Sequence, residues 1–140
     1  MQTKSYLIVG ISGAMAVGLG ALGAHALKAQ LETGLISLNE LNAFDTASKY
    51  QLFHTLAMLA VLLVKDGAEN KRLQWAFQLF LLGIIFFSGS LYLLSTRHLL
   101  GAEWLRVMGP ITPLGGLFFM AGWLMLGFSM FKNVKAKQSE

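Results

Sequence analysis

The chain has 140 residues, of which 55% are hydrophobic and only 13% are charged, whereas soluble domains carry about 25% charged residues. With a mean hydropathy of +0.59, this composition predicts one integral membrane domain over residues 1–140, with the lipid bilayer as its surroundings. The absence of cysteine excludes disulfides, thiolate metal sites and lipid-modified cysteines. The net charge of +4 does not point to nucleic acid, because the basic residues flank apolar segments.

The first apolar segment, residues 6–27, is 22 residues long and contains no charged side chain. At about 1.5 Å per residue, a helix of this length covers roughly 33 Å, enough for a hydrocarbon core of about 30 Å. Lys4 and the small residues around 24–26 also fit a cleaved signal peptide, but the apolar core of a signal is typically only about 7–15 residues. We therefore expect a membrane-spanning helix.

Glycine and alanine recur along this segment at the spacing of helix faces. One stripe consists of Gly13, Ala16, Gly20 and Gly23. A second stripe consists of Gly10, Ala14 and Gly18. Small residues at this spacing let helices pack closely in lipid, so we expect packing within the chain, or alternatively a homo-oligomer in which one stripe faces a second copy. Three later glycines are expected to serve helix packing in the same way: Gly83, Gly115 and Gly122.

The rest of the chain predicts three further spans, at about residues 45–64, 73–96 and 111–131. Asp45 is a plausible helix start, and Pro113 suits a first helical turn. Between the first two spans, the leucines fit either a short amphipathic helix at the interface or an ordered loop. A short turn is expected over residues 65–72, where Gly67 and Asn70 interrupt the pattern.

Four spans place both chain ends on one side of the membrane, and the basic residues indicate which side. The N-terminus, the second connection and the tail hold seven of the 11 lysines and arginines, and the opposite side holds four. The positive-inside rule then predicts that both termini are cytoplasmic.

With this orientation, the unusual polar residues of all four spans lie toward the outer end of the bundle. They are His25, Tyr50, Gln51, His54, Ser90, Tyr92 and Thr112. Polar groups within lipid usually face the bundle interior and bond to each other, so we expect one polar cluster. His54 is then either a hydrogen-bonded packing residue or a group that handles protons or small solutes.

Patterns typical of chemistry are missing from the sequence. Two histidines without nearby Asp, Glu or Cys make a thin ligand set, so no metal site is expected. We find no paired carboxylates within a span, no Ser-His-Asp order with a nucleophile turn and no phosphate loop, and expect neither enzyme activity nor a cofactor. The G-x-G-x-x-G pattern at residues 18–23 lies inside an apolar span rather than after a strand, so it does not indicate a dinucleotide site.

Four sequence blocks, in order, resemble the DUF423 family. They are GAHALK at 23–28, YQLFHTLA at 50–57, GSLY at 89–92 and ITPLGG at 111–116, the last followed by Gly122-Trp123. The family comprises small bacterial inner-membrane proteins of the UPF0382 group, and the eukaryotic transmembrane protein 256 is similar. The resemblance implies a multi-span protein of the bacterial inner membrane, but no activity, substrate or catalytic residue.

The sequence thus predicts an all-α, four-helix transmembrane bundle with both termini inside. The favoured function is a non-enzymatic membrane module that binds a partner or lipid. The alternative is a small transporter or pore whose polar path uses the residues around His54 and His25. An enzyme acting on lipid is a more distant alternative, because no nucleophile–base pair is visible.

Overall fold

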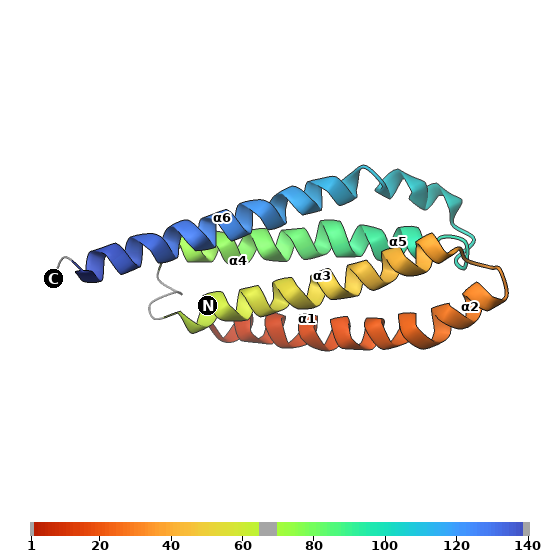
Figure 1. Cartoon of the computed structure of the whole chain (residues 1–140), viewed down its shortest axis with the longest axis horizontal. Coiled ribbons are helices and arrows are strands. Elements are labelled where there is room, and N and C mark those ends of the chain that lie inside the picture. Colours follow the sequence, from red (N-terminus) through yellow and green to blue (C-terminus); the bar gives the residue numbers. More distant parts are fainter. Residues whose placement is uncertain (1, 65–69, 139–140) are drawn as a thin grey trace.

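The computed structural model describes residues 2–64 and 70–138, and every regular element in them is a helix (Figure 1). These elements form four rods. The first rod consists of α1 (Gln2–Leu22), the π-helical η1 (Gly23–Leu27) and α2 (Lys28–Glu32), and the second is α3 (Leu38–Leu63). The third consists of α4 (Lys71–Gly83), the π-helical η2 (Ile84–Ser88) and α5 (Gly89–Thr96). The 3-10 helix η3 (Glu103–Met108) precedes the fourth rod, α6 (Ile111–Gln138).

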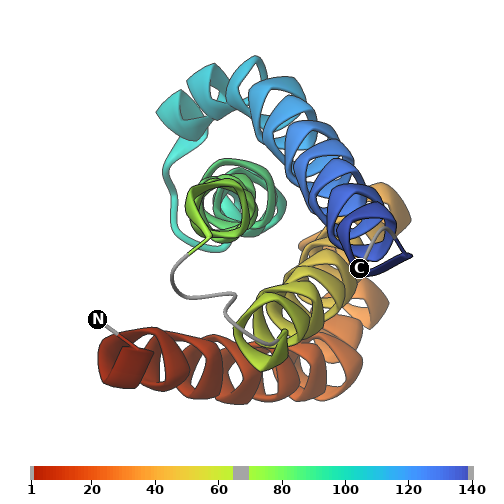
Figure 2. The same ribbon diagram turned by 90° about the vertical axis from the view of Figure 1, so that its left-hand side faces the viewer.

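The rods run antiparallel, each to the next. Residues 2 and 138 lie toward one end of the bundle, and the connections 33–37 and 97–110 lie at the other, which we call the distal end (Figure 1). α3 packs against α1 on one side and against α4, η2 and α5 on the other, and α6 packs on α4 and η2. Seen along the rods, α1 and α6 lie on opposite sides of the bundle (Figure 2).

The start of α3 differs from the predicted start near residue 45, and a local motif explains why. The Ser37 hydroxyl accepts a hydrogen bond from the backbone N–H of Glu40 at 3.3 Å, and the Glu40 carboxylate accepts one from the backbone N–H of Ser37 at 2.8 Å. This capping box satisfies two backbone donors and begins the helix at Leu38. Gly34, with φ of +76°, follows the end of the first rod in the left-handed conformation that glycine tolerates best.

The connection predicted over residues 28–44, either a short amphipathic helix or an ordered loop, is mostly helical in the structure. The amphipathic residues are divided between the end of the first rod and the start of α3, and only residues 33–37 join the two. Most of the turn predicted at 65–72 lies outside the described residues. Its last part is described: Asn70 caps α4 by accepting a hydrogen bond from the backbone N–H of Arg72 at 3.0 Å.

The first small-residue stripe lies against α3. A Cβ atom added at Gly13, Gly20 or Gly23 would come within 3.7 Å of Thr55, Ser48 or Phe44, respectively. By contrast, a Cβ atom at Gly10 or Gly18 would meet nothing within 4 Å, so the second stripe faces outward. The two stripes therefore differ: the first brings α1 and α3 together, and the second is free of contacts within the described chain.

Three glycines bring α6 close to the third rod. A Cβ at Gly83 would overlap the ring of Phe119, and one at Gly122 would overlap the ring of Phe80. At Gly115 a Cβ would overlap the backbone of Phe87, so the two helices meet there backbone to backbone.

Within residues 2–64 and 70–138, three stretches are long and apolar enough to cross a membrane: Thr3–Glu32, Lys71–Thr96 and Glu103–Phe131. α3 is long enough at 26 residues, but polar residues such as Lys49, Gln51 and His54 lower its hydropathy. Along α3 these polar residues separate two apolar clusters. The larger cluster includes Met58, Val61 and Phe80, and the smaller one, at the distal end, comprises Leu27, Ile36 and Phe44.

Candidate functional site

A polar network around Gln51 joins α3 to two other rods. Gln51 is buried, its side-chain amide donates to the backbone carbonyl of Ser12 at 3.0 Å, and its side-chain carbonyl accepts from the Tyr92 hydroxyl at 3.0 Å. Thr55 donates to the backbone carbonyl of Gln51 at 2.7 Å, so the Ser12 hydroxyl is the donor in its 2.7 Å bond to Thr55. We call Ser12, Gln51, Thr55 and Tyr92 the Gln51 network. It links α1, α3 and α5 through the interior.

His54 forms a second group, between α3 and α6. Its Nδ1 lies 2.7 Å from the backbone carbonyl of Tyr50, and its Nε2 lies 3.2 Å from the indole nitrogen of Trp123. A carbonyl can only accept and an indole N–H can only donate, so the proton is on Nδ1 and the ring is neutral. The ring also stacks on Phe119, with centroids 3.4 Å apart at 12°. Both nitrogens of His54 are thus occupied.

Tyr50 lies beside this group without being buried in it. Its side chain is 41% exposed, and its ring stacks on Phe87 with centroids 4.7 Å apart. It therefore contributes a ring face and a backbone carbonyl to the His54 group.

Ser90 and Thr112 form a third group, between α5 and the start of α6. Their hydroxyls lie 2.7 Å apart, and Ser90 also donates to the backbone carbonyl of Phe87 at 3.0 Å. Because the single Ser90 proton is used in that bond, Thr112 is the donor between the two hydroxyls. The one cluster expected from the sequence is thus three separate hydrogen-bonded groups at three helix contacts.

His25 does not join any of these groups, and its predicted place among them is wrong. It is exposed on η1, and its side chain makes no hydrogen bond to the described part of the chain. The first rod packs on α3 through the face that carries Gly23, and a side chain two residues further along points to the opposite side of the helix. His25 therefore faces out of the bundle.

A cluster of charged side chains at the distal end was missed by the sequence analysis. It consists of Glu40, Arg97, His98, Glu103 and Arg106, and we call it the ionic cluster. Arg97 Nη2 lies 2.9 Å from Glu40 Oε1, and Arg97 Nη1 donates to the backbone carbonyl of Leu94 at 2.8 Å. His98 Nδ1 lies 2.5 Å from Glu103 Oε1. The exposed Arg106 is 3.5 Å from Glu103 Oε2. These pairs join the start of α3 to the segment between α5 and α6.

Glu40 is the most deeply buried acid of the ionic cluster, with a side chain that is only 10% exposed. Burial by itself raises the pKa of its carboxyl group. Hydrogen bonds from the backbone N–H and hydroxyl of Ser37, with the charges of Arg97 and His98, outweigh burial, so the pKa of Glu40 lies below its usual value. Glu40 is therefore ionised at neutral pH.

The sequence contained a signal for part of the ionic cluster. Ser-x-x-Glu at residues 37–40 is a capping box, which predicts a helix start and places Glu40 in the first turn. No local pattern links Glu40 to Arg97, because the two meet only when the distal connections fold together. Among the described residues, no group of three His, Cys, Asp or Glu side chains is arranged to hold a metal ion.

Apolar rods joined by buried polar bonds define a helical membrane protein, and comparison with known proteins agrees. A family model described as "Protein of unknown function (DUF423)" matches residues 19–116. The UPF0382 membrane protein of Staphylococcus haemolyticus is 39% identical over 132 residues, covering 94% of this chain and 98% of the relative. A Staphylococcus aureus relative of the same name is 41% identical over 130 residues, covering 92% and 97%.

The similarity extends beyond the staphylococci. A UPF0382 membrane protein of Haemophilus influenzae is 39% identical over 133 residues, covering 95% of this chain and 98% of the relative. No solved structure matches the chain significantly. The chain belongs to the DUF423 family, so the predicted resemblance is confirmed.

Proposed function

We propose that this protein is a non-enzymatic module of the bacterial inner membrane that crosses the bilayer four times and binds a partner or lipid. The observation that carries this proposal is the occupancy of the buried polar groups. Both ends of the Gln51 amide are bonded to other rods, and His54 is bonded to α6 through Nε2 and to the Tyr50 carbonyl of its own helix through Nδ1. Such groups hold helices together, and neither ring nitrogen of His54 is free to take up a passing solute.

The position of α3 supports a fourth span. It runs between the first and third rods, which are each long and apolar enough to cross a membrane. Its polar side chains Gln51, His54 and Thr55 are at most 6% exposed, so they are shielded from lipid by the neighbouring rods. A helix that lies alongside spanning neighbours over such a length crosses the bilayer with them.

The orientation follows from the same four rods. An even number of crossings puts both termini on one side, and the excess of lysine and arginine in the N-terminus, second connection and tail supports the cytoplasm as that side. The relatives carry the name of membrane proteins in both staphylococci and Haemophilus influenzae. A helical bundle with both termini in the cytoplasm fits the inner membrane of a bacterium.

The topology is tested with reporter proteins fused to the full chain. A reporter active only in the cytoplasm is expected to work at either terminus. A reporter active only outside is expected to work when inserted in the connections at residues 33–37 and 97–102. If the two termini report different compartments, the four-span proposal fails.

The role of the buried polar groups is tested by His54→Ala, with the exposed His25→Ala as the matched control. Loss of His54 leaves the Trp123 N–H without its acceptor and opens space beside Phe119, so we expect a loss of about 1–3 kcal/mol in the free energy of unfolding. His25→Ala is expected to leave the thermal unfolding midpoint unchanged. A flux of protons or small solutes through wild-type proteoliposomes that His54→Ala abolishes would instead favour the transporter alternative.

A further inference from the structure

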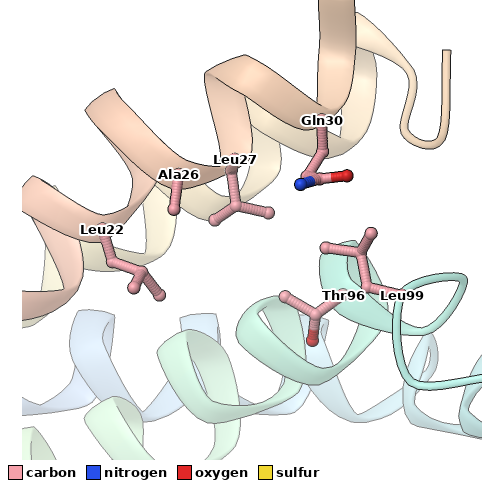
Figure 3. A pocket seen from close by; sticks show the side chains of 6 residues that line it. All are labelled: Leu22, Ala26, Leu27, Gln30, Thr96 and Leu99. Carbon is pink, nitrogen blue, oxygen red and sulfur yellow. The ribbon is translucent and has the colours of Figure 1, made fainter. Parts of the chain in front are cut away.

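A groove of about 350 Å³ opens at the distal end between the first rod and the end of α5 (Figure 3). Its lining residues are Leu22, Ala26, Leu27, Gln30, Thr96 and Leu99. The four side chains of the first rod point across the groove toward Thr96 and Leu99 (Figure 3). No described part of the bundle closes this space, because the first rod packs mainly on α3 and not on α5.

The shape of the first rod contributes to this groove. Ala26 and Leu27 belong to η1, a π-helical turn, and such turns are rare and often occur at functional sites. Leu27 is buried at the base, where it packs with Ile36 and Phe44. Leu22 and Leu99 are 48% and 40% exposed, so the groove leaves aliphatic surface uncovered.

The polarity of the groove changes along its length. Leu22 and Ala26 form the part nearest the middle of the first rod, and Gln30 lies near the end of that rod. The Gln30 carboxamide makes no hydrogen bond to the described residues, whereas its backbone carbonyl accepts from Thr33 and Leu35. The first-rod wall and Thr96 belong to candidate spans, which end at Glu32 and Thr96, and Leu99 lies just beyond the second of these spans. The groove therefore passes from the apolar part of these spans to their polar edge.

We infer that this groove binds one acyl chain of a membrane phospholipid, with the Gln30 carboxamide bonding the ester region. The order along the first-rod wall, from Leu22 and Ala26 to Gln30, matches the order of chain and ester in such a lipid. A volume of about 350 Å³ is at the low end of the roughly 300–1,000 Å³ of small-molecule pockets, which suits part of one chain rather than a whole lipid. The inference rests on the proposed four-span topology, which gives the groove a lateral opening to the bilayer.

The charges beside the groove indicate little selection for the head group. The ionic cluster next to Thr96 contains two acids, two arginines and His98, which are paired with each other. Lys28 and Glu32, on either side of Gln30, carry opposite charges. A site without a surplus positive charge gains little from an anionic head group. We therefore expect phosphatidylethanolamine and phosphatidylglycerol to bind alike.

The test uses the full chain in vesicles of phosphatidylethanolamine and phosphatidylglycerol that contain a phospholipid with a photoreactive group within one acyl chain. After irradiation, labelled peptides are identified by mass spectrometry. Labelling of residues 22–30 and 96–99 is expected to exceed labelling of the outward face around Leu7 and Ile11 several-fold. Uniform labelling of all lipid-facing surfaces would overturn the inference, because it would indicate surrounding lipid only.

Ala26→Trp fills the groove, and Ala14→Trp is the matched control, since Ala14 is exposed on the same rod away from the groove. We expect Ala26→Trp to lower the groove labelling several-fold and Ala14→Trp to leave it unchanged, with equal thermal unfolding midpoints. If Ala26→Trp does not fold, Ala26→Leu serves with a smaller expected loss. Undiminished labelling in a folded groove variant would overturn the inference.

A second copy of the chain is the competing occupant, and the absence of native cysteine allows a direct test. If Ala26→Cys forms a disulfide-linked dimer in the membrane while the groove peptides resist the photoreactive lipid, the groove is an interface between copies and the inference is wrong. The proposed function is tested separately. Loss of groove labelling with both termini cytoplasmic would remove only the lipid site, whereas termini in different compartments would remove the topology itself.

Discussion

At the scale of single residues, the buried polar side chains of this bundle differ in whether their polar atoms have hydrogen-bond partners. Ser95 is buried, and its hydroxyl donates to the backbone carbonyls of Leu91 and Tyr92. Ser88 is equally buried on η2, but its hydroxyl has no hydrogen-bond partner within the described chain. A buried hydroxyl without a partner loses its hydration and gains nothing in return. These two serines therefore form a natural pair for comparison.

We expect Ser88→Ala to raise the free energy of unfolding by about 1 kcal/mol, because it removes a desolvated hydroxyl and no hydrogen bond. Ser95→Ala is expected to lower it by up to about 1 kcal/mol, because it removes a hydroxyl that is bonded. Thermal unfolding of both variants in the same detergent measures the difference. A destabilised Ser88→Ala would show that this hydroxyl has a partner that the chain itself does not supply.

At the scale of elements, the first rod carries two small-residue stripes with different surroundings. The stripe with Gly20 packs on α3, where a Cβ would lie 3.6 Å from the Ser48 hydroxyl. The stripe with Gly18 contacts nothing in the described chain. Sequence spacing revealed both stripes, since small residues at intervals of three and four share a helix face. It could not rank them, because steps of 3, 4 and 3 in one stripe and of 4 and 4 in the other both keep small residues on one face. The neighbour that each stripe meets depends on the fold.

Gly20→Leu is expected to separate α1 from α3 and to cost about 1–3 kcal/mol, the usual range for overfilling a close contact. Gly18→Leu, the control, is expected to leave the unfolding midpoint unchanged. The oligomeric state of both variants, measured by light scattering in detergent, addresses the predicted homo-oligomer. If Gly18→Leu turns an oligomer into a folded monomer, the outward stripe is the contact between copies. An unchanged midpoint in Gly20→Leu would contradict the packing described for this face.

At the scale of the whole molecule, the ionic cluster joins the start of α3 to the connection between α5 and α6. Arg97, His98 and Glu103 follow α5, whereas Glu40 lies in the first turn of α3. The pKa of Glu40 is lowered in the folded protein, so its ionisation favours folding. For such a group the stabilisation is complete above its ordinary pKa of about 4.5 and is lost as the pH falls through the lower folded value.

We therefore expect the thermal unfolding midpoint of the wild type to change little from neutral pH to about 4.5 through this group, and to fall below it. Glu40→Gln cannot lose this charge, so it is expected to start from a lower midpoint and to fall less in acid. Unfolding curves of both proteins at a series of pH values in one detergent measure the effect. Parallel curves for wild type and variant would show that Glu40 does not contribute to acid sensitivity.

Much of this architecture is determined locally. Long apolar runs, helix-spaced glycines and the family blocks predict helices, their packing faces and the membrane setting. Each of these signals lies within one short stretch of the chain, because helix periodicity and burial in lipid depend on residues that are close in sequence. Helix ends were less well predicted, since the capping box at Ser37 extends α3 well before its apolar part. The contacts of each side chain were decided by the packing of segments that are distant in the sequence. His25 faces outward while His54 bonds Trp123, and Glu40 meets Arg97, because the rotation of each rod about its axis depends on how all four pack together.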